Sequence, residues 1–126
     1  MQSKENASKL STRLTSLVFT KEERLHRAED FSRTRKKGKK TITKNLFIYS
    51  ILNDKGLRRI GLSVSRRVGN SPKRARTKRL LREFFRQNKE VFPESSDILV
   101  VVKSGRTLKN YESVKTEITE ALCKEH

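Results

Sequence analysis

The sequence has few of the residues that build disulfide frameworks, zinc sites or membrane spans. It contains one cysteine, Cys123, and two histidines that stand far apart, His26 and His126. A single thiol excludes an internal disulfide and a cysteine-rich zinc site. No apolar run approaches the ~18–20 residues of a membrane-spanning helix, and no apolar signal-peptide core follows the N-terminus. We therefore expect a protein of the cytoplasm that has no membrane partner.

Groups for acid–base or nucleophilic catalysis are also scarce. Aspartate and glutamate together number 14, and half of them follow residue 89. No Ser-His-Asp pattern, paired carboxylate or glycine-rich phosphate loop is present. The sequence therefore predicts no catalytic residue and no metal site in the protein itself. If the chain takes part in a reaction, something else must supply the reacting centre.

Positive charge is what the sequence has in excess. The 126 residues suit one domain, and they include 31 lysines and arginines, which gives a formal net charge of +17 and a pI of about 10.6. The excess is concentrated between residues 21 and 89, which hold 23 basic and six acidic side chains. A polyanion is the default partner of such a chain, and this imbalance predicts one basic face on a small domain.

The spacing of apolar residues predicts an α/β sandwich. Helices are expected at residues 29–37, 72–90 and 111–124. Strands are expected at residues 45–52, 59–65 and 97–103, with a weaker edge strand at 40–43. Ser71 is the expected N-cap of the second helix, and Asn110 that of the third. Because a helix joins strands 59–65 and 97–103, these two strands are expected to be parallel.

The first residues of the chain differ from the rest. Residues 1–16 are polar and include several serines and threonines. We expect them to form a flexible extension, followed by one folded domain that spans residues 17–126.

The second predicted helix has a basic face with little compensating charge. Its apolar side chains fall on one side, and the opposite side carries Lys78, Arg79, Arg82, Arg86 and Lys89. A solvated surface is the ordinary explanation of a charged helix face, but such faces mix glutamate with lysine at i,i+4 spacing. Here residues 66–89 contain ten basic side chains and one acid. Arginine binds phosphate oxygens better than lysine does, because its planar guanidinium can donate two parallel hydrogen bonds. The face therefore predicts nucleic-acid binding.

The predicted strand at residues 45–52 is apolar on both faces. Alternation places Phe47 and Tyr49 on one face and Leu46 and Ile48 on the other. A small domain has one core, so only one of these faces can be core. The aromatic face could stack unpaired bases, as single-strand binders do, or it could be the core face; the sequence pattern leaves both open.

Several runs of the sequence resemble the bacterial ribonuclease P protein subunit. Residues 61–70, GLSVSRRVGN, and residues 74–83, RARTKRLLRE, are similar to that family's strand, loop and basic helix. Residues 24–31, RLHRAEDF, resemble its opening helix, and residues 97–103, DILVVVK, its last strand. The resemblance covers roughly residues 17–122.

The resemblance implies a fold and a function that spacing alone does not show. The implied fold is a single-domain α+β sandwich of order αβββαβα, with a four-stranded sheet and a left-handed βαβ crossover like that of some ribosomal proteins. The implied protein is a subunit of a ribonucleoprotein endonuclease. It binds a catalytic RNA and the 5′ leader of precursor tRNA, and the RNA, with Mg²⁺, hydrolyses the bond that frees the mature 5′ end. No obligate protein partner is implied. A structural ribosomal protein or an RNA chaperone is the alternative.

The family's binding residues carry over to matching positions of this sequence. Those implied for the catalytic RNA are Arg66, Arg67, Asn70, Arg74, Arg76, Lys78, Arg79, Arg82 and Arg86. Those implied for the precursor-tRNA leader are Phe31, Arg35, Phe47, Tyr49 and Lys103. The family's Arg-Asn-Arg motif is Arg-Ala-Arg here, so Ala75 removes one amide. Arg35 replaces a second aromatic of the first helix, and its guanidinium can still stack or pair with phosphate.

The charge predicts a steep dependence of RNA affinity on salt. If binding displaces about six phosphate counterions, a plot of log K against log salt should have a slope of about −4 to −5 for single strands or −5 to −6 for duplex. Filter binding between about 50 and 300 mM salt measures it. A slope shallower than about −2 would contradict the expectation of a basic binding face.

Overall fold

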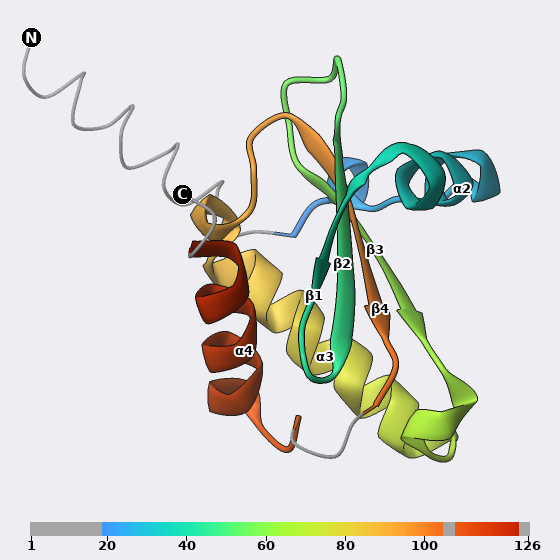
Figure 1. Cartoon of the computed structure of the whole chain (residues 1–126), viewed down its shortest axis with the longest axis vertical. Coiled ribbons are helices and arrows are strands. Elements are labelled where there is room, and N and C mark those ends of the chain that lie inside the picture. The colour runs from blue at the N-terminus through green and yellow to red at the C-terminus, as the bar shows by residue number, and fades with distance from the viewer. Residues whose placement is uncertain (1–18, 105–107, 124–126) are drawn as a thin grey trace, which may run out of the picture.

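The computed structural model describes residues 19–104 and 108–123 (Figure 1). Within these ranges the helices are α2 (Ala28–Lys37), α3 (Ser71–Gln87) and α4 (Tyr111–Cys123). The strands are β1 (Lys39–Ile42), β2 (Leu46–Leu52), β3 (Arg59–Val64) and β4 (Ser96–Val102), and three 3-10 turns are η1 (Lys21–Glu23), η2 (Arg66–Val68) and η3 (Lys89–Val91). The extension expected at residues 1–16 lies outside the described ranges. No helix in the described ranges is long and apolar enough to cross a membrane.

The four strands form one mixed sheet in the order β1-β2-β4-β3. β2 pairs antiparallel with β1 and β4, whereas β3 and β4 are parallel. In Figure 1 both parallel strands point downward, β4 lies to the left of β3, and α3 passes behind the sheet between them, so the crossover is left-handed. The α+β fold expected for the family, including the weak edge strand, is confirmed.

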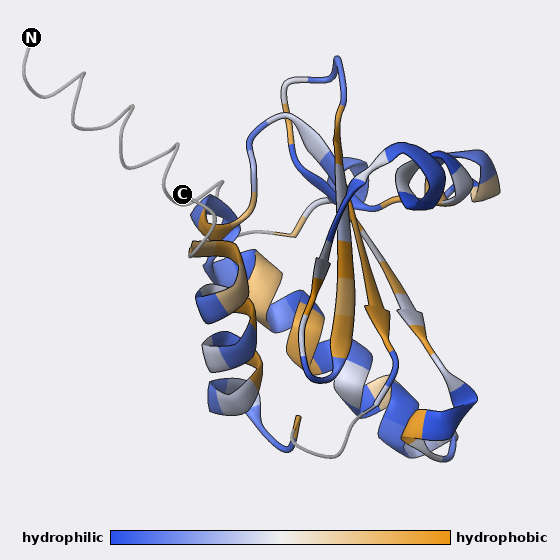
Figure 2. Cartoon of the chain, viewed as in Figure 1, coloured by the Kyte–Doolittle hydropathy of each residue, from blue (hydrophilic) through white to orange (hydrophobic). Residues whose placement is uncertain are grey.

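The apolar core lies on one face of the sheet, under α3 and α4. Phe84 and Phe85 of α3 and Val114 and Ile118 of α4 are almost completely buried there. The sheet side chains that meet them are Leu46, Ile48, Ile60, Ile98, Val100 and Val102. Figure 2 shows the hydrophobic faces of the two helices turned toward the strands and the hydrophilic face of α3 turned away. The core therefore fixes which side of α3 is left for a ligand.

The two ends of α3 differ from the sequence prediction. Asn70, not Ser71, is the N-cap, because the Asn70 side chain accepts a hydrogen bond from the Lys73 amide at 3.1 Å. The helix ends at Gln87 rather than near residue 90, and the chain turns into η3. Lys89 consequently leaves the basic face on which the helical count placed it. Its ammonium lies 2.7 Å from the carboxylate of Glu23 and joins η3 to η1.

The opposite face of the sheet is only partly covered, by α2. Phe31 of α2 packs onto Gly61 of β3 so closely that a Cβ at residue 61 would lie 2.6 Å from the ring. Gly38 ends α2 as expected, but in extended backbone with a φ of −76°. The glycine is needed there for space, since a Cβ would lie 2.3 Å from the carbonyl oxygen of Thr34. Close backbone approach at two glycines therefore sets how near α2 lies to the sheet.

A buried carboxylate joins α2 to the sheet. Asp97 of β4 is fully buried, and its oxygens accept two hydrogen bonds of 2.7 Å from Arg59 of β3. Arg33 of α2 donates a third bond at 2.8 Å, and the Asn53 amide donates a fourth at 2.8 Å. Burial by itself raises the pKa of Asp97, but these hydrogen bonds and the charge of Arg59 outweigh it and hold the pKa below its ordinary value.

We expect Asp97→Asn to destabilise the protein strongly. The substitution keeps the size of the side chain but removes the nearer counter-charge of the Arg59 guanidinium, which is only 13% exposed and keeps Asp30 at the longer distance of 3.6 Å. Breaking a buried ion pair in this way costs about 3–5 kcal/mol. Urea unfolding at pH 7 measures the difference in unfolding free energy between variant and parent. Asp54→Asn, on an exposed turn, is the control and should change little.

The difference in unfolding free energy between the parent and Asp97→Asn should decrease at low pH. The folded-state pKa of Asp97 lies below the unfolded value of ~3.9. Its stabilisation is therefore fully present above that pH and is lost as the pH falls through the folded-state pKa. The gap between parent and Asp97→Asn should shrink below about pH 4. A gap that stays constant down to about pH 2.5 would show that the charge of Asp97 is not what stabilises the fold.

Candidate nucleic-acid interface

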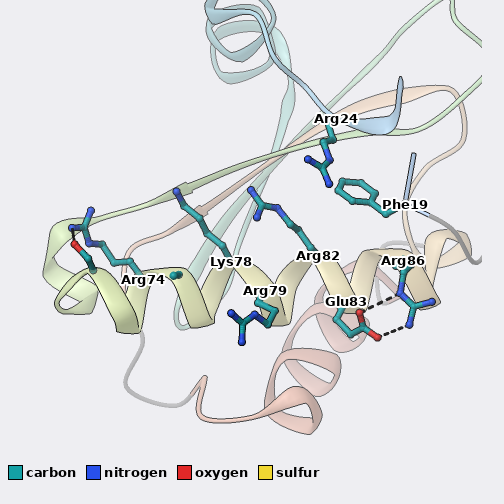
Figure 3. A pocket seen from close by; sticks show the side chains of 10 residues that line it. Phe19, Arg24, Arg74, Lys78, Arg79, Arg82, Glu83 and Arg86 are labelled. Atoms are coloured by element: carbon teal, nitrogen blue, oxygen red, sulfur yellow. Dashed lines mark hydrogen bonds and ion pairs between the residues drawn. The ribbon is translucent and has the colours of Figure 1, made fainter. Parts of the chain in front are cut away.

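The exposed side of α3 forms one wall of a basic groove of about 600 Å³ (Figure 3). Lys78 and Arg82 project from the side of α3 that faces Arg24 and Phe19, as Figure 3 shows, and Arg74 lines the groove near the start of the helix, where its guanidinium donates to Ser71 Oγ at 3.1 Å. Arg79 also lines the groove but points to the other side of the helix in this view. Three cations spaced four residues apart thus follow one line along the helix. This line is suited to the repeating phosphates of a nucleic-acid backbone.

The second wall of the groove comes from the segment before α2. The Phe19 ring packs edge-on against Phe85 with a centroid separation of 5.4 Å, and the Arg24 guanidinium lies 4.9 Å from the Phe19 centroid. The ion pair of Glu23 and Lys89 fixes this segment against η3. Sequence reasoning missed Arg24 as a site residue, because no local spacing indicates that it lies opposite α3.

The single acid of this helix face is already neutralised. Glu83 forms an ion pair with Arg86 three residues later and accepts a further hydrogen bond from Gln87 at 3.2 Å. The hydrogen bond from Arg86 lowers the pKa of Glu83. The little compensating charge that the sequence predicted on this face thus neutralises one cation, Arg86. The other cations of the groove, Arg74, Lys78, Arg79 and Arg82, form no ion pair with an acidic residue of the described ranges.

The remaining residues predicted for the catalytic RNA lie away from this groove. Arg66 and Arg67 are exposed in η2, and Asn70 caps α3. Arg76 is on another side of α3, where its guanidinium donates to the carbonyl oxygen of Lys109 at 3.1 Å. It lines a second groove of about 970 Å³ together with Lys44, Arg67, Lys73, Lys103 and Lys109. Most of the predicted set is thus divided between two basic grooves on either side of the helix, and Arg66 and Asn70 line neither of them.

The sheet face opposite the core has an open row of side chains that crosses all four strands. Pairing aligns Ile42, Phe47, Val101 and Ser63, and each of them retains exposed surface. Two ammonium groups lie over the Phe47 ring. That of Lys40 is 4.2 Å from the ring centroid and that of Lys103 is 4.3 Å from it. An accessible ring flanked by cations can stack on a base while the cations contact its phosphates.

The other predicted leader residues lie along the same face, nearer to α2. Tyr49 belongs to the next row and is 9% exposed, so its ring offers little surface. Phe31 is half-buried against Gly61, and Arg35, one helical turn later, is exposed. The fold therefore brings the predicted leader residues to one face, on which Phe47 and Phe31 are half-buried and Tyr49 is nearly buried.

The described residues do not form a metal site. Within residues 19–104 and 108–123, no three side chains among His, Cys, Asp and Glu are close enough together to hold an ion. The carboxylates of Asp97 and Glu83 are both engaged by guanidinium groups. The oxygen-rich cluster that Mg²⁺ prefers is therefore not offered by the part of the protein that the structure describes.

A basic helix on one side of the sheet and an open aromatic row on the other define a nucleic-acid-binding α/β sandwich. The chain belongs to the Ribonuclease P family, whose sequence profile matches residues 19–125. It is therefore the protein component of a ribonucleoprotein endoribonuclease, which binds RNA and acts in the processing of precursor tRNA. Nothing in the comparisons supports a ribosomal or chaperone role.

The similarity to known proteins extends over most of the chain. The ribonuclease P protein component of Syntrophus aciditrophicus is 37% identical over 109 residues, which is 86% of this chain and 92% of that protein. That of Dictyoglomus turgidum is 40% identical over 100 residues, 79% of this chain and 83% of that protein. The structure of the Staphylococcus aureus RNase P protein superimposes with a TM-score of 0.73 at 26% identity, covering 82% of this chain and 94% of that one.

Proposed function

We propose that the protein contacts two RNAs through two separate surfaces. The groove along α3, together with η2, binds the catalytic RNA, and the open sheet face beside α2 binds the 5′ leader of precursor tRNA. The observation that carries this division is the position of the core, which separates α3 from the open row of Phe47 by the thickness of the sheet. One RNA can therefore occupy each surface without excluding the other.

The charge pattern supports the assignment of α3 to the larger RNA. The groove presents cations from two chain segments, Arg24 on one side and α3 on the other, and its one carboxylate is neutralised internally. Contacts of this kind bind backbone phosphates and carry no base specificity. They suit a folded RNA that is recognised by its shape.

The open aromatic row supports the assignment of the sheet face to a single strand. Unpaired bases stack on accessible rings, and such stacking tolerates any base. The leader of a precursor tRNA is the single-stranded part of the substrate, so Phe47 with Lys40 and Lys103 suits it chemically. Arg35 extends this surface along α2.

The reaction itself is assigned to the RNA component. Mg²⁺ held mainly by that RNA supplies the charge stabilisation for hydrolysis of the phosphodiester bond. The described protein residues offer no oxygen-rich site, and their role is to bind and orient the two RNAs. We also propose that residues 17–126 act as one RNA-binding domain after a flexible extension at 1–16, and that the protein works in the cytoplasm.

Removal of two α3 cations should weaken assembly with the catalytic RNA. Arg79 and Arg82 are both exposed, so the double variant Arg79→Ala/Arg82→Ala should fold normally. Since exposed ion pairs contribute up to ~1 kcal/mol each, we expect affinity for the catalytic RNA to fall about 5- to 30-fold and the salt slope to fall by about 2. Native gel titration at several salt concentrations measures both quantities.

A matched control removes two exposed cations elsewhere. Lys55→Ala/Lys115→Ala makes the same change in net charge on the β2–β3 turn and on α4. It should leave the affinity within about twofold of the parent. Equal losses in the two double variants would mean that only net charge matters and would contradict a specific α3 surface.

Removal of the open ring should weaken binding of the leader alone. A stacked base contributes ~1–3 kcal/mol, so Phe47→Ala in the holoenzyme should lower affinity for precursor tRNA about 5- to 150-fold. Affinity for mature tRNA, which lacks the leader, should not change. The ratio of the two dissociation constants is the measurement, and thermal melts establish that the variant is folded.

Two further variants sharpen this test. Leu52→Ala removes a 75% exposed apolar side chain from the same strand and should keep the parent ratio. Tyr49→Phe keeps the ring and should have at most a small effect. The leader surface is rejected if folded Phe47→Ala retains the parent ratio.

A further inference from the structure

We propose that Arg33 is a positioning residue for leader binding, which it supports by tethering α2 to the buried carboxylate of Asp97. This inference rests on the proposed leader surface beside α2. In it, Arg33 makes no contact with RNA. It holds the helix that carries Phe31 and Arg35 in place over the sheet.

The tether spans the two layers through one short hydrogen bond. The Arg33 guanidinium donates to Asp97 Oδ2 at 2.8 Å, on the same carboxylate that Arg59 binds through two further bonds. Arg59 also lies 3.6 Å from Asp30 at the start of α2. Positive and negative side chains thus alternate along one chain of contacts. It runs from Arg33 of α2 to Asp97 of β4, then to Arg59 of β3, and returns to α2 at Asp30.

Buried apolar side chains contribute little to the position of α2. The helix has ten residues and no side-chain N-cap, and Thr34 is its one buried residue. In comparison, α3 buries Thr77, Leu81, Phe84 and Phe85. A helix of ten residues is not stable by itself, and apolar burial beneath α2 is small. The ionic tether therefore has a larger part in placing α2 than it would have for a helix with a broad apolar face.

The tether also determines which α2 cations face the RNA. Arg33 donates to Asp97, although 41% of its side chain is exposed, and Arg35 is exposed to solvent. Phe31 lies against Gly61 at the edge of the open row. If α2 moved away from the sheet, the ring of Phe31 and the guanidinium of Arg35 would leave the leader surface together.

The test compares Arg33→Gln with Lys36→Gln, which removes an exposed charge from the same helix. In the holoenzyme, Arg33→Gln should reduce the preference for precursor over mature tRNA at least fivefold and leave affinity for the catalytic RNA within about twofold. Lys36→Gln should reduce the preference less than twofold. Arg33→Lys should restore part of it, because an ammonium can donate to Asp97 but lacks the planar fork. Equal preferences in Arg33→Gln and Lys36→Gln would overturn the proposal.

A double-mutant cycle separates positioning from direct contact. If Arg33 acts through α2, the effects of Arg33→Gln and Phe31→Ala on the preference should be clearly less than additive, and the salt slope of precursor binding should not change in Arg33→Gln. Additive effects with a slope reduced by about 1 would show that Arg33 binds a phosphate and would overturn the proposal. If Phe31→Ala and Phe47→Ala both leave the preference unchanged, the proposal that the sheet face binds the leader is rejected. If only Arg33→Gln leaves the preference unchanged, the proposed positioning role of Arg33 is rejected and the leader surface is retained.

Discussion

The constraint on which the structure depends is that the chain has apolar side chains for one core only. Hydrophobic residues make up 33% of the sequence, and they are used to pack α3 and α4 on one face of the sheet. The other face must hold α2 with few apolar contacts, and the ion pairs that Arg33 and Arg59 form with the buried carboxylate of Asp97 take over that task. Apolar packing on one side and ion pairing on the other leave a sheet face that is partly open. That open face is the surface we assign to single-stranded RNA.

The same core decides the role of α3. Its apolar side is buried, so its cations are forced onto one exposed side and repel one another there. Glu83 relieves part of this repulsion by pairing with Arg86. The rest is relieved when a polyanion lies in the groove, which makes binding strongly dependent on salt. The ring of Phe19 and the Glu23–Lys89 ion pair hold Arg24 across from this line of cations, so that the surface is a groove and not a bare helix face.

Local patterns predicted the elements of this fold well, and long-range contacts account for what they missed. Period-two and period-3.6 spacing located β2, β3, β4 and the helices, because these elements bury whole stripes of side chains. The position of Lys89 was missed, since the helix ends at Gln87, where the Asn88 side chain donates to the Phe84 carbonyl oxygen at 3.0 Å and to the distant Tyr111 hydroxyl at 2.8 Å. The left-handed crossover followed from family resemblance, because right-handed crossovers are the norm.

The candidate site shows the same limit. The family resemblance predicted which residues bind the leader. It did not indicate that Tyr49 is nearly buried and that Phe47 is only half-buried. It also did not indicate the pairing of Asp97 with Arg33, which lie 64 residues apart. Nothing near either residue in the sequence predicts a buried ion pair, because the pairing depends on how α2 crosses β4.

A protein with this charge can assist an RNA catalyst without taking part in the bond cleavage. The catalytic RNA and the precursor are both polyanions, so their approach is opposed by electrostatic repulsion that salt and Mg²⁺ screen. In the proposed arrangement the protein lies between them, with α3 toward one RNA and the open sheet face toward the other, and its net charge of +17 offsets part of that repulsion. A carboxylate cluster for Mg²⁺ on either surface would remove positive charge where the phosphates lie. In the proposed division of roles the protein therefore binds and orients the two RNAs, and the metal lies with the RNA component.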